Sequence, residues 1–342
     1  MKIMHLLTSN AFSGAENVVC QIINSLKSEY NIESIYCSPV GPIKDTLRDK
    51  GIPYMPIINM KIKDVKEAVK TYKPDIIHAH GTTAAVIVSM ACWNAPIIFH
   101  IHNNSLNSRC LSIKSIANLL PFFRSRHLIW VTQNCLECYK FASIVKHKST
   151  VINNGIDLSL FSNSRKKTDE NKLIMVSRFA PAKDQATVIR AMPLIDERFH
   201  LFFVGDGEKR QDSETLVKQL NLMDRVHFLG TRTDIPQIVG DAFIGIQSSL
   251  WEGFGMSAVE IMASGIPVIA SDADGLKQVV EGAGLIFKTR DEVDLANKIM
   301  LLASDKSLYK NISDACLERA KKYSIEGTSS KCFEIYKSIV NV

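Results

Sequence analysis

Short apolar runs alternate with amphipathic helical patterns along almost the whole chain of 342 residues, and this alternation limits the fold more than any other feature. Runs typical of strands lie at 3–7, 32–37, 75–78, 97–101, 128–131, 150–152, 172–176, 200–204, 226–228, 243–246, 268–269 and 284–286. Helical patterns lie at 14–26, 43–49, 63–71, 83–91, 112–123, 184–192, 213–220, 235–240, 256–263, 275–280, 291–303 and about 329–340. Strands that are apolar throughout and alternate with helices form parallel sheets covered on both faces. The sequence therefore predicts an α/β protein with doubly wound parallel sheets.

The length and one polar stretch predict two domains. A chain of 342 residues is too long for one ordinary core, and the polar stretch 162–171 is typical of a linker. We expect a first domain at 1–161, a second at 172–323, and a helix within 324–342 that packs back on the first. Two such domains facing each other would form a cleft at the carboxyl ends of both sheets, where open α/β sheets bind ligands.

Composition excludes several classes of protein. No apolar run approaches the length of a membrane span, and the start of the chain lacks the long apolar region of a signal peptide. The eight cysteines are scattered, as expected of reduced thiols, and Cys135 and Cys138 form a single CxxC without a second pair for zinc. We therefore expect a cytoplasmic protein.

Positive charge is concentrated in the first half of the chain. Residues 1–165 contain 18 Lys and Arg against 10 Asp and Glu, whereas the whole chain contains 41 against 35. The first domain therefore either meets an anionic partner or has a surface coated with lysines.

The stretch Ser248–Glu260 places two carboxylates, those of Glu252 and Glu260, on either side of a glycine-rich turn between a strand and a helix. Such a turn is where parallel crossover units bind ligands. Gly253 and Gly255 let backbone N–H groups come close to a ligand, and the start of a helix favours an anion. The pattern predicts a phosphate-bearing ligand with a hydroxyl-rich group held by the acids.

Two cations, Arg178 and Lys183, follow the first strand of the second domain, where they could grip one pyrophosphate. The two cations, and the carboxylate of Glu260, also have an interpretation in which they serve only the structure. The cations could be solvated surface side chains, and Ser257 and Glu260 could form a capping box that only closes the helix.

Two further glycine turns follow strands of the second domain, at Gly205 and Gly230. Gly205 lies in Gly-Asp-Gly, which is not the GxGxxG fingerprint of dinucleotide-binding proteins. The main sequence signal of a nicotinamide-dependent dehydrogenase is therefore missing at this turn. The second is followed by Arg232, which could lie beside a nucleotide base.

In order and spacing these motifs resemble the retaining glycosyltransferases of family 4, which have the GT-B fold of two facing Rossmann-like domains. The resemblance covers essentially the whole chain, and the ordered set is more specific than any one motif. The matching landmarks are Ser13-Gly-Ala-Glu16, His102, Asn154-Gly-Ile-Asp157, Arg178, Lys183, Gly205-Asp-Gly207, Gly230, Glu252, Glu260, Ser264-Gly-Ile-Pro267 and Gly275.

The resemblance implies a donor site in the second domain and an acceptor site in the first. Glu260 would bind the ribose hydroxyls of a nucleotide-sugar, and Glu252 would contact the transferred sugar. Arg178 and Lys183 would hold the pyrophosphate and stabilise the charge that grows on it. The backbone amides around Glu252 would assist, those of Gly253, Phe254, Gly255 and Met256, and Gly205 and Arg232 would lie nearby.

In the first domain the resemblance assigns Gly14 to the phosphates, through the helix that it opens, and His102 to the active site. The family often has a second glycine where Ser13 stands, so this turn departs from the family pattern. Alternation along the strand points His100 and His102 to the same side. His102 could instead be a polar loop histidine, and we interpret His78 and His80 as lining or structural residues.

Retention would proceed by attack on the face that the phosphate leaves, with that phosphate accepting the proton, so no side-chain nucleophile is required. We expect no cofactor and no metal ion, because Asp272 and Asp274 fall in an ordinary turn of the family pattern. The expected substrates are a nucleotide-sugar, most commonly a UDP-sugar in this family, and a saccharide or polyprenyl-linked oligosaccharide. The expected setting is synthesis of a bacterial surface polysaccharide by a hexosyltransferase-type enzyme, with no nucleic-acid partner.

Two other functions stay open. A sugar-nucleotide epimerase of the same fold would need acid and base groups around the sugar ring. A degenerate binding subunit would have lost some of Arg178, Lys183, Glu252 and Glu260, and all four are present.

The segment 106–127 combines Arg109, Lys114, Arg124 and Arg126 with an apolar stripe. A helix that meets anionic lipid has this composition, and so does a core-facing helix with a solvated basic edge. The membrane hypothesis places the basic first domain on the inner membrane face as a peripheral protein.

Overall fold

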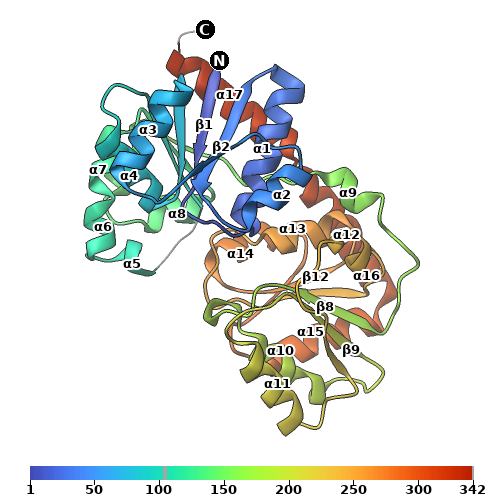
Figure 1. Cartoon of the computed structure of the whole chain (residues 1–342). Helices are drawn as coiled ribbons and strands as arrows, with labels where there is room; N and C mark the ends of the chain where they lie inside the picture. The colour runs from blue at the N-terminus through green and yellow to red at the C-terminus, as the bar shows by residue number, and fades with distance from the viewer. Residues whose placement is uncertain (103–105, 341–342) are drawn as a thin grey trace. The chain divides into compact units, whose positions relative to one another are not determined.

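The structure is a computed structural model that describes residues 1–102 and 106–340. These residues form two compact units (Figure 1). The first unit contains Met1–Ile156 together with Ile325–Val342, and the second contains Asp157–Ser324. The first unit is therefore built from both ends of the chain, and the second from one continuous segment.

A parallel sheet of seven strands forms the centre of the first unit, in the order β3-β2-β1-β4-β5-β6-β7. The strands are β1 (Lys2–Leu6), β2 (Glu33–Pro39), β3 (Tyr54–Ile57), β4 (Ile76–His80), β5 (Ile97–Ile101), β6 (His127–Trp130) and β7 (Ser149–Val151). Every residue of β4 and β5 is buried, as expected for central strands of a sheet covered on both faces.

Helices connect these strands, and the last helix of the chain joins them. They are α1 (Gly14–Tyr30), α2 (Ile43–Asp49), α3 (Ile62–Tyr72), α4 (Thr82–Ala91), α5 (Leu106–Arg109), α6 (Ile113–Ala117), α7 (Leu119–Arg124), α8 (Gln133–Cys138) and α17 (Ile325–Val340). A 3₁₀ helix, η1, spans Ala142–Lys148. In Figure 1, α17 runs beside α1, and hydrogen bonds tie it to the unit, one joining Ser329 Oγ to Ser25 Oγ over 2.6 Å.

The second unit contains a parallel sheet of six strands, in the order β10-β9-β8-β11-β12-β13. The strands are β8 (Lys172–Val176), β9 (His200–Val204), β10 (Val226–Phe228), β11 (Ile244–Gln247), β12 (Val268–Ser271) and β13 (Leu285–Phe287). The order reverses between β8 and β11, which makes the pair of strands β8 and β11 the switch point where ligands bind in such sheets.

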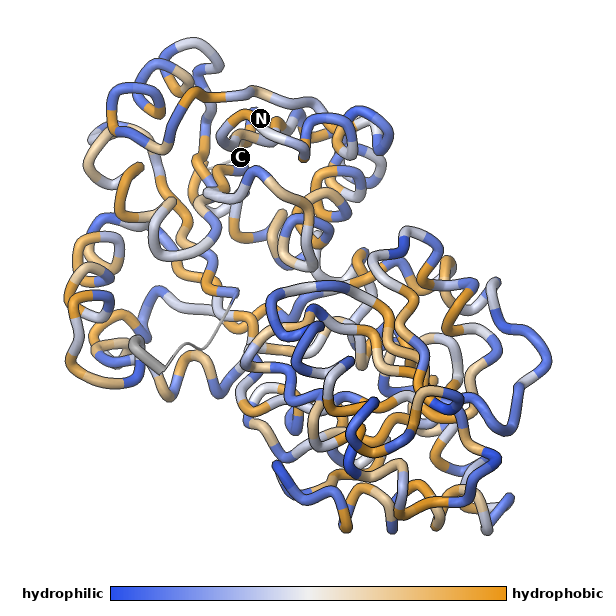
Figure 2. Tube along the Cα trace, turned by 60° about the horizontal axis from the view of Figure 1, so that its bottom comes forward, coloured by the Kyte–Doolittle hydropathy of each residue, from blue (hydrophilic) through white to orange (hydrophobic). Residues whose placement is uncertain are grey.

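Helices cover both faces of this second sheet. They are α9 (Leu158–Ser162), α10 (Gln185–Ala191), α11 (Arg210–Gln219), α12 (Ile235–Val239), α13 (Met256–Ala263), α14 (Asp274–Val280), α15 (Glu292–Ser304) and α16 (Lys306–Lys321), with 3₁₀ turns η2 (Pro181–Lys183) and η3 (Met192–Leu194). Hydrophobic segments run through the interior of the unit, and hydrophilic segments are concentrated in its outer loops (Figure 2). The core includes Phe199, Leu201 and Phe203 from β9 and its approach.

The predicted fold class, two doubly wound parallel-sheet domains, is confirmed. The sequence analysis missed β3, a short strand with Pro56 in it; proline is tolerated there because β3 is an edge strand. It also missed α16, whose pattern is mostly polar.

The single helix expected at 112–123 is two helices, α6 and α7, which meet at Asn118. Pro121 explains the break, because its ring would clash with the carbonyl of Ala117 in a continuous helix. The two units divide at Ile156 and Asp157, before α9, whereas the sequence analysis placed the first boundary at residue 161.

No helix among the described residues is both long enough and apolar enough to span a membrane.

Candidate functional site

The carboxyl edge of the second sheet brings together a cation and a carboxylate that are far apart in the sequence. Lys183 ends η2, which follows β8, and Glu252 lies in the turn after the neighbouring strand β11. The Nζ atom of Lys183 contacts Oε2 of Glu252, and the two side chains are only 20% and 18% exposed. A partly buried ion pair of this kind places both charges at the switch point of the sheet.

Hydrogen bonds fix the turn that carries Glu252. The Leu250 amide donates to the Ala182 carbonyl over 2.8 Å, which ties the turn to η2. The Ser249 amide donates to Ser271 Oγ, and the Ser271 hydroxyl donates back to the Ser249 carbonyl, both over 2.8 Å. The turn is thus held by the ends of two neighbouring strands, β11 and β12.

Two glycines allow the turn that carries Glu252 to lead into α13 and to pack against α14. Gly255 has φ +99° and is the N-cap of α13, a conformation that favours glycine. At Gly275, near the start of α14, a Cβ would lie 2.4 Å from the Gly253 carbonyl oxygen and 2.5 Å from that of Glu252. Close packing of α14 against the turn therefore requires glycine at 275. Gly253 and Phe254 are buried between these elements.

The capping box that was the alternative interpretation of Ser257 and Glu260 does not form. Helix α13 begins at Met256 with Gly255 as N-cap and without a side-chain cap, so Ser257 already lies inside the helix. Glu260 lies one turn further along α13 and is half-buried. Burial raises the pKa of Glu260 to about 7, because an ionised carboxylate is poorly solvated there.

Arg178 lies in the loop after β8 and is exposed. Its backbone is anchored by the buried Gln185, whose Nε2 donates to the Arg178 carbonyl over 2.9 Å. The Gly205 turn packs on the same loop, because a Cβ at Gly205 would lie 2.1 Å from the Ser177 carbonyl oxygen. The Gly205 amide donates to the Gly230 carbonyl over 2.8 Å, so the three loops after β8, β9 and β10 lie side by side.

Arg232 lies two residues after Gly230 and forms a bidentate salt bridge with Asp234. Its Nε donates to Oδ1 over 2.8 Å and its Nη2 donates to Oδ2 over 2.7 Å. Both side chains are largely exposed, which makes this a surface pair of small energetic value. The structure thus places Arg232 on the loop next to the Gly205 turn and pairs it with Asp234.

In the first unit, Gly14 is the first residue of α1, which follows β1. Nothing lies within 4 Å of the position that a Cβ at Gly14 would occupy, so the space in front of this helix start is open. The preceding residue Ser13 donates its hydroxyl to the Glu16 carboxylate instead of capping the helix.

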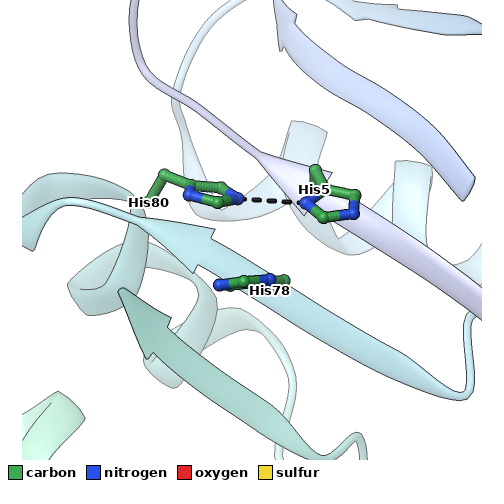
Figure 3. Close-up of side chains that lie close together, drawn as sticks. All are labelled: His5, His78 and His80. Atoms are coloured by element: carbon green, nitrogen blue, oxygen red, sulfur yellow. Dashed lines mark hydrogen bonds between the residues drawn. The ribbon is translucent and has the colours of Figure 1, made fainter. Parts of the chain in front are cut away.

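His102 follows β5 and lies in a cluster of five histidines on one face of the first sheet. Strand register puts His5 beside His78 and His80 beside His100. Figure 3 shows three of them: His5 on β1 is hydrogen-bonded to His80 on β4, with His78 next to both rings. The rings of His100 and His102 stack with centroids 3.9 Å apart, as the alternation along β5 predicts.

Burial is the first cause of the low basicity of all five rings. It lowers the pKa of His5 to about 3 and that of His102 to about 4, and it lowers the pKa of His78, His80 and His100 well below the ordinary value. At neutral pH all five imidazoles are therefore uncharged.

By distance, two triplets could hold a metal ion, because one nitrogen from each ring lies within 4.8 Å of the others: His5, His78 and His80, and His80, His100 and His102. In the first triplet the ring planes argue against this use. His78 and His80 stack at 4.2 Å with an interplanar angle of 25°, so their in-plane lone pairs run nearly side by side and do not converge on one point. Neither triplet includes a carboxylate to balance the charge of an ion.

The sequence analysis anticipated most of the elements that carry these residues. It placed Lys183 and Glu252 in one site, and the structure brings them into direct contact. It did not anticipate Gln185 and Ser271, which hold the loops, or His5, which completes the histidine cluster. Alternating histidines in several strands of one predicted sheet were the signal available for His5.

Comparisons with known proteins agree with this architecture. Residues 12–160 match the family described as Glycosyltransferase Family 4, and residues 159–319 match Glycosyl transferases group 1. The two matches together span both units.

Two bacterial relatives resemble the chain over most of its length. It is 27% identical to the UDP-Gal:alpha-D-GlcNAc-diphosphoundecaprenol alpha-1,3-galactosyltransferase of Escherichia coli, covering 90% of this chain and 89% of the relative. It is also 27% identical to the putative glycosyltransferase EpsF of Bacillus subtilis, covering 84% and 83%.

Solved structures show the same fold. The crystal structure of Anabaena HepE in complex with UDP and glucose matches with a TM-score of 0.89 and 22% identity, covering 99% of this chain and 100% of that one. A sucrose-phosphate synthase from Thermosynechococcus elongatus matches with a TM-score of 0.80 and 20% identity, covering 98% of each chain.

Proposed function

The chain belongs to the family 4 glycosyltransferases and has their GT-B fold, and from that premise we propose that it transfers a sugar from a UDP-sugar to a saccharide or polyprenyl-linked acceptor. The transfer retains the anomeric configuration and uses no metal ion. The relative named for UDP-galactose and for a diphosphoundecaprenol acceptor supports this choice of substrates, as does HepE in complex with UDP and glucose.

The contact between Lys183 and Glu252 at the switch point carries the proposal. One side chain supplies positive charge for a diphosphate, and the other supplies acceptor oxygens for sugar hydroxyls. Their contact puts both functions where one nucleotide-sugar could reach them. Glu260, one turn into α13, then takes the ribose hydroxyls.

Charge development explains why these groups would accelerate transfer. Negative charge grows on the diphosphate as the bond to the sugar breaks, so Arg178 and Lys183 bind the transition state more tightly than the ground state. The acceptor hydroxyl attacks on the face that the phosphate leaves, and a phosphate oxygen takes its proton. No carboxylate has to act as nucleophile, unlike in retaining glycosidases.

Thermal-shift measurements with a panel of nucleotide-sugars test the donor class. We expect a UDP-sugar to raise the melting temperature more than the corresponding GDP- or ADP-sugars, because at equal concentration the ligand with the lower Kd stabilises the folded state more. Equal stabilisation by every nucleotide-sugar, or by none, would contradict the donor assignment.

Two substitutions separate the roles of the acids. Glu260→Ala should weaken binding of UDP itself, because the ribose loses its acceptor. Glu252→Ala should leave UDP binding within about threefold and mainly impair use of the intact UDP-sugar, by about 1–3 kcal/mol for lost hydrogen bonds to a charged group. The opposite pattern in calorimetry would mean that the two roles are exchanged.

We further propose that the protein works at the cytoplasmic face of the membrane, as a peripheral protein in surface polysaccharide synthesis. The segment that holds α6 and α7 supports this, because four of its apolar side chains are exposed: Leu111 (70%), Ile113 (89%), Ile116 (53%) and Phe123 (65%). Three basic residues of the same segment lie close to them in the sequence: Lys114, Arg124 and Arg126. A core-facing helix would have buried these apolar groups, whereas an interfacial one presents them to lipid.

Vesicle flotation tests the membrane proposal. The protein should float with vesicles that contain anionic lipid and not with neutral ones, and Ile113→Ser with Phe123→Ser should reduce flotation about tenfold or more. Ile58→Ser is a control, because the exposure of Ile58 (77%) lies between those of Ile113 and Phe123 and Ile58 lies on another part of the first unit. No binding to anionic vesicles, or equal loss in the control, would refute the proposal.

A further inference from the structure

A pocket of about 340 Å³ lies at the amino-terminal edge of the first sheet. Its lining residues come shortly before three neighbouring strands, β5, β6 and β7. They include Trp93 before β5, Arg124, Ser125 and Arg126 before β6, and Lys148 before β7. The volume falls within the range of small-molecule sites, about 300–1,000 Å³.

This pocket is separate from the candidate site described above. His102 follows β5, whereas the pocket precedes it, and the five residues of β5 put about 16 Å of strand between the two. Ligands of open α/β sheets bind at the carboxyl edge, so a pocket at the amino edge needs an explanation of its own.

Three cations line the pocket, and no carboxylate lines it among the described residues. The cations are Arg124, Arg126 and Lys148. Burial lowers the pKa of Lys148, and the neighbouring charge of Arg126 lowers it further. An anion bound between these like charges would relieve their repulsion.

Backbone carbonyls hold two of the cations in place. Nη2 of Arg124 donates to two carbonyls of the loop between α4 and β5, over 3.0 and 2.9 Å. Nζ of Lys148 donates to two carbonyls at the end of α7, over 3.3 and 2.8 Å. The Arg124 guanidinium also lies 4.9 Å from the centroid of the Trp93 ring. Both cations are therefore positioned by the protein itself, which reduces the entropy that binding of a ligand costs.

Two polar atoms of the lining residues are buried without a hydrogen-bond partner among the described residues. They are Nε of Arg124 and Oγ of Ser125, and Ser125 is only 2% exposed. Buried polar groups almost always have a partner. Unpaired N–H and O–H groups beside a pocket lined by cations therefore indicate an acceptor that the protein itself does not supply.

We propose that this pocket is a second binding site of the protein, which takes a phosphate group between Arg124, Arg126 and Lys148. Arginine presents N–H groups that match two phosphate oxygens at once, and lysine adds a compact positive charge. The site rests on the geometry of the pocket and not on the proposed glycosyl transfer.

The rim of the pocket indicates a lipid as the source of the phosphate. Trp93 and Phe123 both line the pocket and are 69% and 65% exposed. Exposed aromatic rings beside basic residues are typical of surfaces that lie among lipid headgroups. We therefore expect the headgroup phosphate of an anionic phospholipid to occupy the site, and this choice of source rests on the proposed membrane location.

Tryptophan fluorescence tests the site with inorganic phosphate, at an ionic strength held constant with sodium chloride. The emission of Trp93 should change saturably as phosphate binds, because its ring lies against the Arg124 guanidinium. Trp93→Phe should abolish the change, which separates it from any signal of Trp251 beside Glu252. No saturable change, or the same change in Trp93→Phe, would overturn the proposal.

Arg126→Gln removes an exposed cation of the pocket, and Lys146→Gln is its matched control. Lys146 is also exposed and lies two residues before Lys148, but it does not line the pocket. Arg126→Gln should weaken phosphate binding about tenfold or more, the usual effect of losing a hydrogen bond to a charged group, and Lys146→Gln should leave it within about twofold. Equal weakening by both would mean a diffuse attraction to a basic surface and would overturn the proposal.

Flotation with vesicles that contain phosphatidylglycerol separates the two sources of phosphate. If the headgroup occupies the pocket, Arg126→Gln should lower vesicle affinity about tenfold more than Lys146→Gln does. Equal flotation of both variants, with the fluorescence response lost only in Arg126→Gln, would overturn the lipid source and identify free phosphate as the ligand of the site. Failure to transfer sugar would contradict the proposed function and leave the fluorescence result standing.

Discussion

Glu252 and Lys183 have electrostatic surroundings that differ from those of Glu260, which lies one turn into α13. The first two pair with each other at the end of the sheet. Glu260 has no cation among the causes that set its pKa, and burial alone raises that pKa to about 7. The protonation of Glu260 therefore changes near neutral pH, and ribose hydroxyls that donate to it would favour the ionised form.

Stability should accordingly depend on pH through Glu260. A folded-state pKa above the ordinary one means that the protein is most stable when the group is neutral, below about pH 4.5, and loses that stability as pH rises through about 7. Glu260→Gln should therefore unfold like the native protein at pH 4 and be more stable at pH 8, by about 3 kcal/mol at most. Denaturant unfolding at both pH values measures this, and an equal difference at pH 4 and pH 8 would refute it.

Binding of a UDP-sugar should change with pH in the opposite sense. Affinity should rise as pH increases through about 7, because only the ionised carboxylate accepts both ribose hydroxyls, and the dependence should vanish in Glu260→Gln. A UDP-sugar is the suitable probe, since its diphosphate lacks the phosphate ionisation near pH 6. Calorimetry that finds the same pH dependence in both proteins would exclude Glu260 as its origin.

At the scale of elements, the turn that carries Glu252 depends on how closely helices approach it. Helix α14 can pack against the Glu252 turn only because Gly275 has no side chain, as the distances of 2.4 and 2.5 Å to two carbonyl oxygens show. The opposite case is Gly14 at the start of α1, where the space is open. Gly275 is therefore needed for packing within the protein, whereas a side chain at position 14 would meet open space.

Alanine at these two positions should act differently. Gly275→Ala should destabilise the protein by about 1–3 kcal/mol, as overpacking does, and displace the turn enough to weaken UDP-sugar binding. Gly14→Ala, the matched control, should leave the melting temperature unchanged or slightly higher, because alanine is the better helix former. Equal destabilisation by both substitutions would refute the steric argument.

At the scale of the whole molecule, the two units differ in how the chain builds them. The second is continuous from Asp157 to Ser324, whereas the first needs α17 from the end of the chain. Helix α17 buries Cys332, Ile335 and Tyr336, and the Tyr336 hydroxyl is hydrogen-bonded to Nδ1 of His78 over 2.7 Å. Burial of a side chain of this size contributes about 1.5–3 kcal/mol. Several such side chains together contribute as much as the whole free energy of unfolding of a domain.

Fragments should reflect this difference. Residues 157–324 alone should unfold cooperatively and bind UDP, with Glu260→Ala abolishing the binding, whereas residues 1–156 alone should not fold. Circular dichroism and calorimetry on the two fragments measure this. A folded 1–156 fragment would show that α17 is dispensable for the first unit.

Local patterns carried most of the architecture. Apolar runs of strand length, helical periodicity and glycine turns are properties of neighbouring residues, so they predicted the parallel sheets and all the strands except β3, where a proline at an edge weakened the signal. Helix α16 was missed because its pattern is mostly polar. Its stability comes from packing against other elements and not from its own periodicity.

The sequence by itself therefore determined the α/β class, the alternation of elements and the loops that carry Arg178, Lys183, Glu252 and Glu260. Only the tertiary structure decided that Lys183 and Glu252 touch, that α17 is hydrogen-bonded to Ser25 and His78, and that His5, His80 and His102 form one hydrogen-bonded chain. Those contacts join residues tens to hundreds of positions apart. They depend on strand order and register, which a local pattern does not encode.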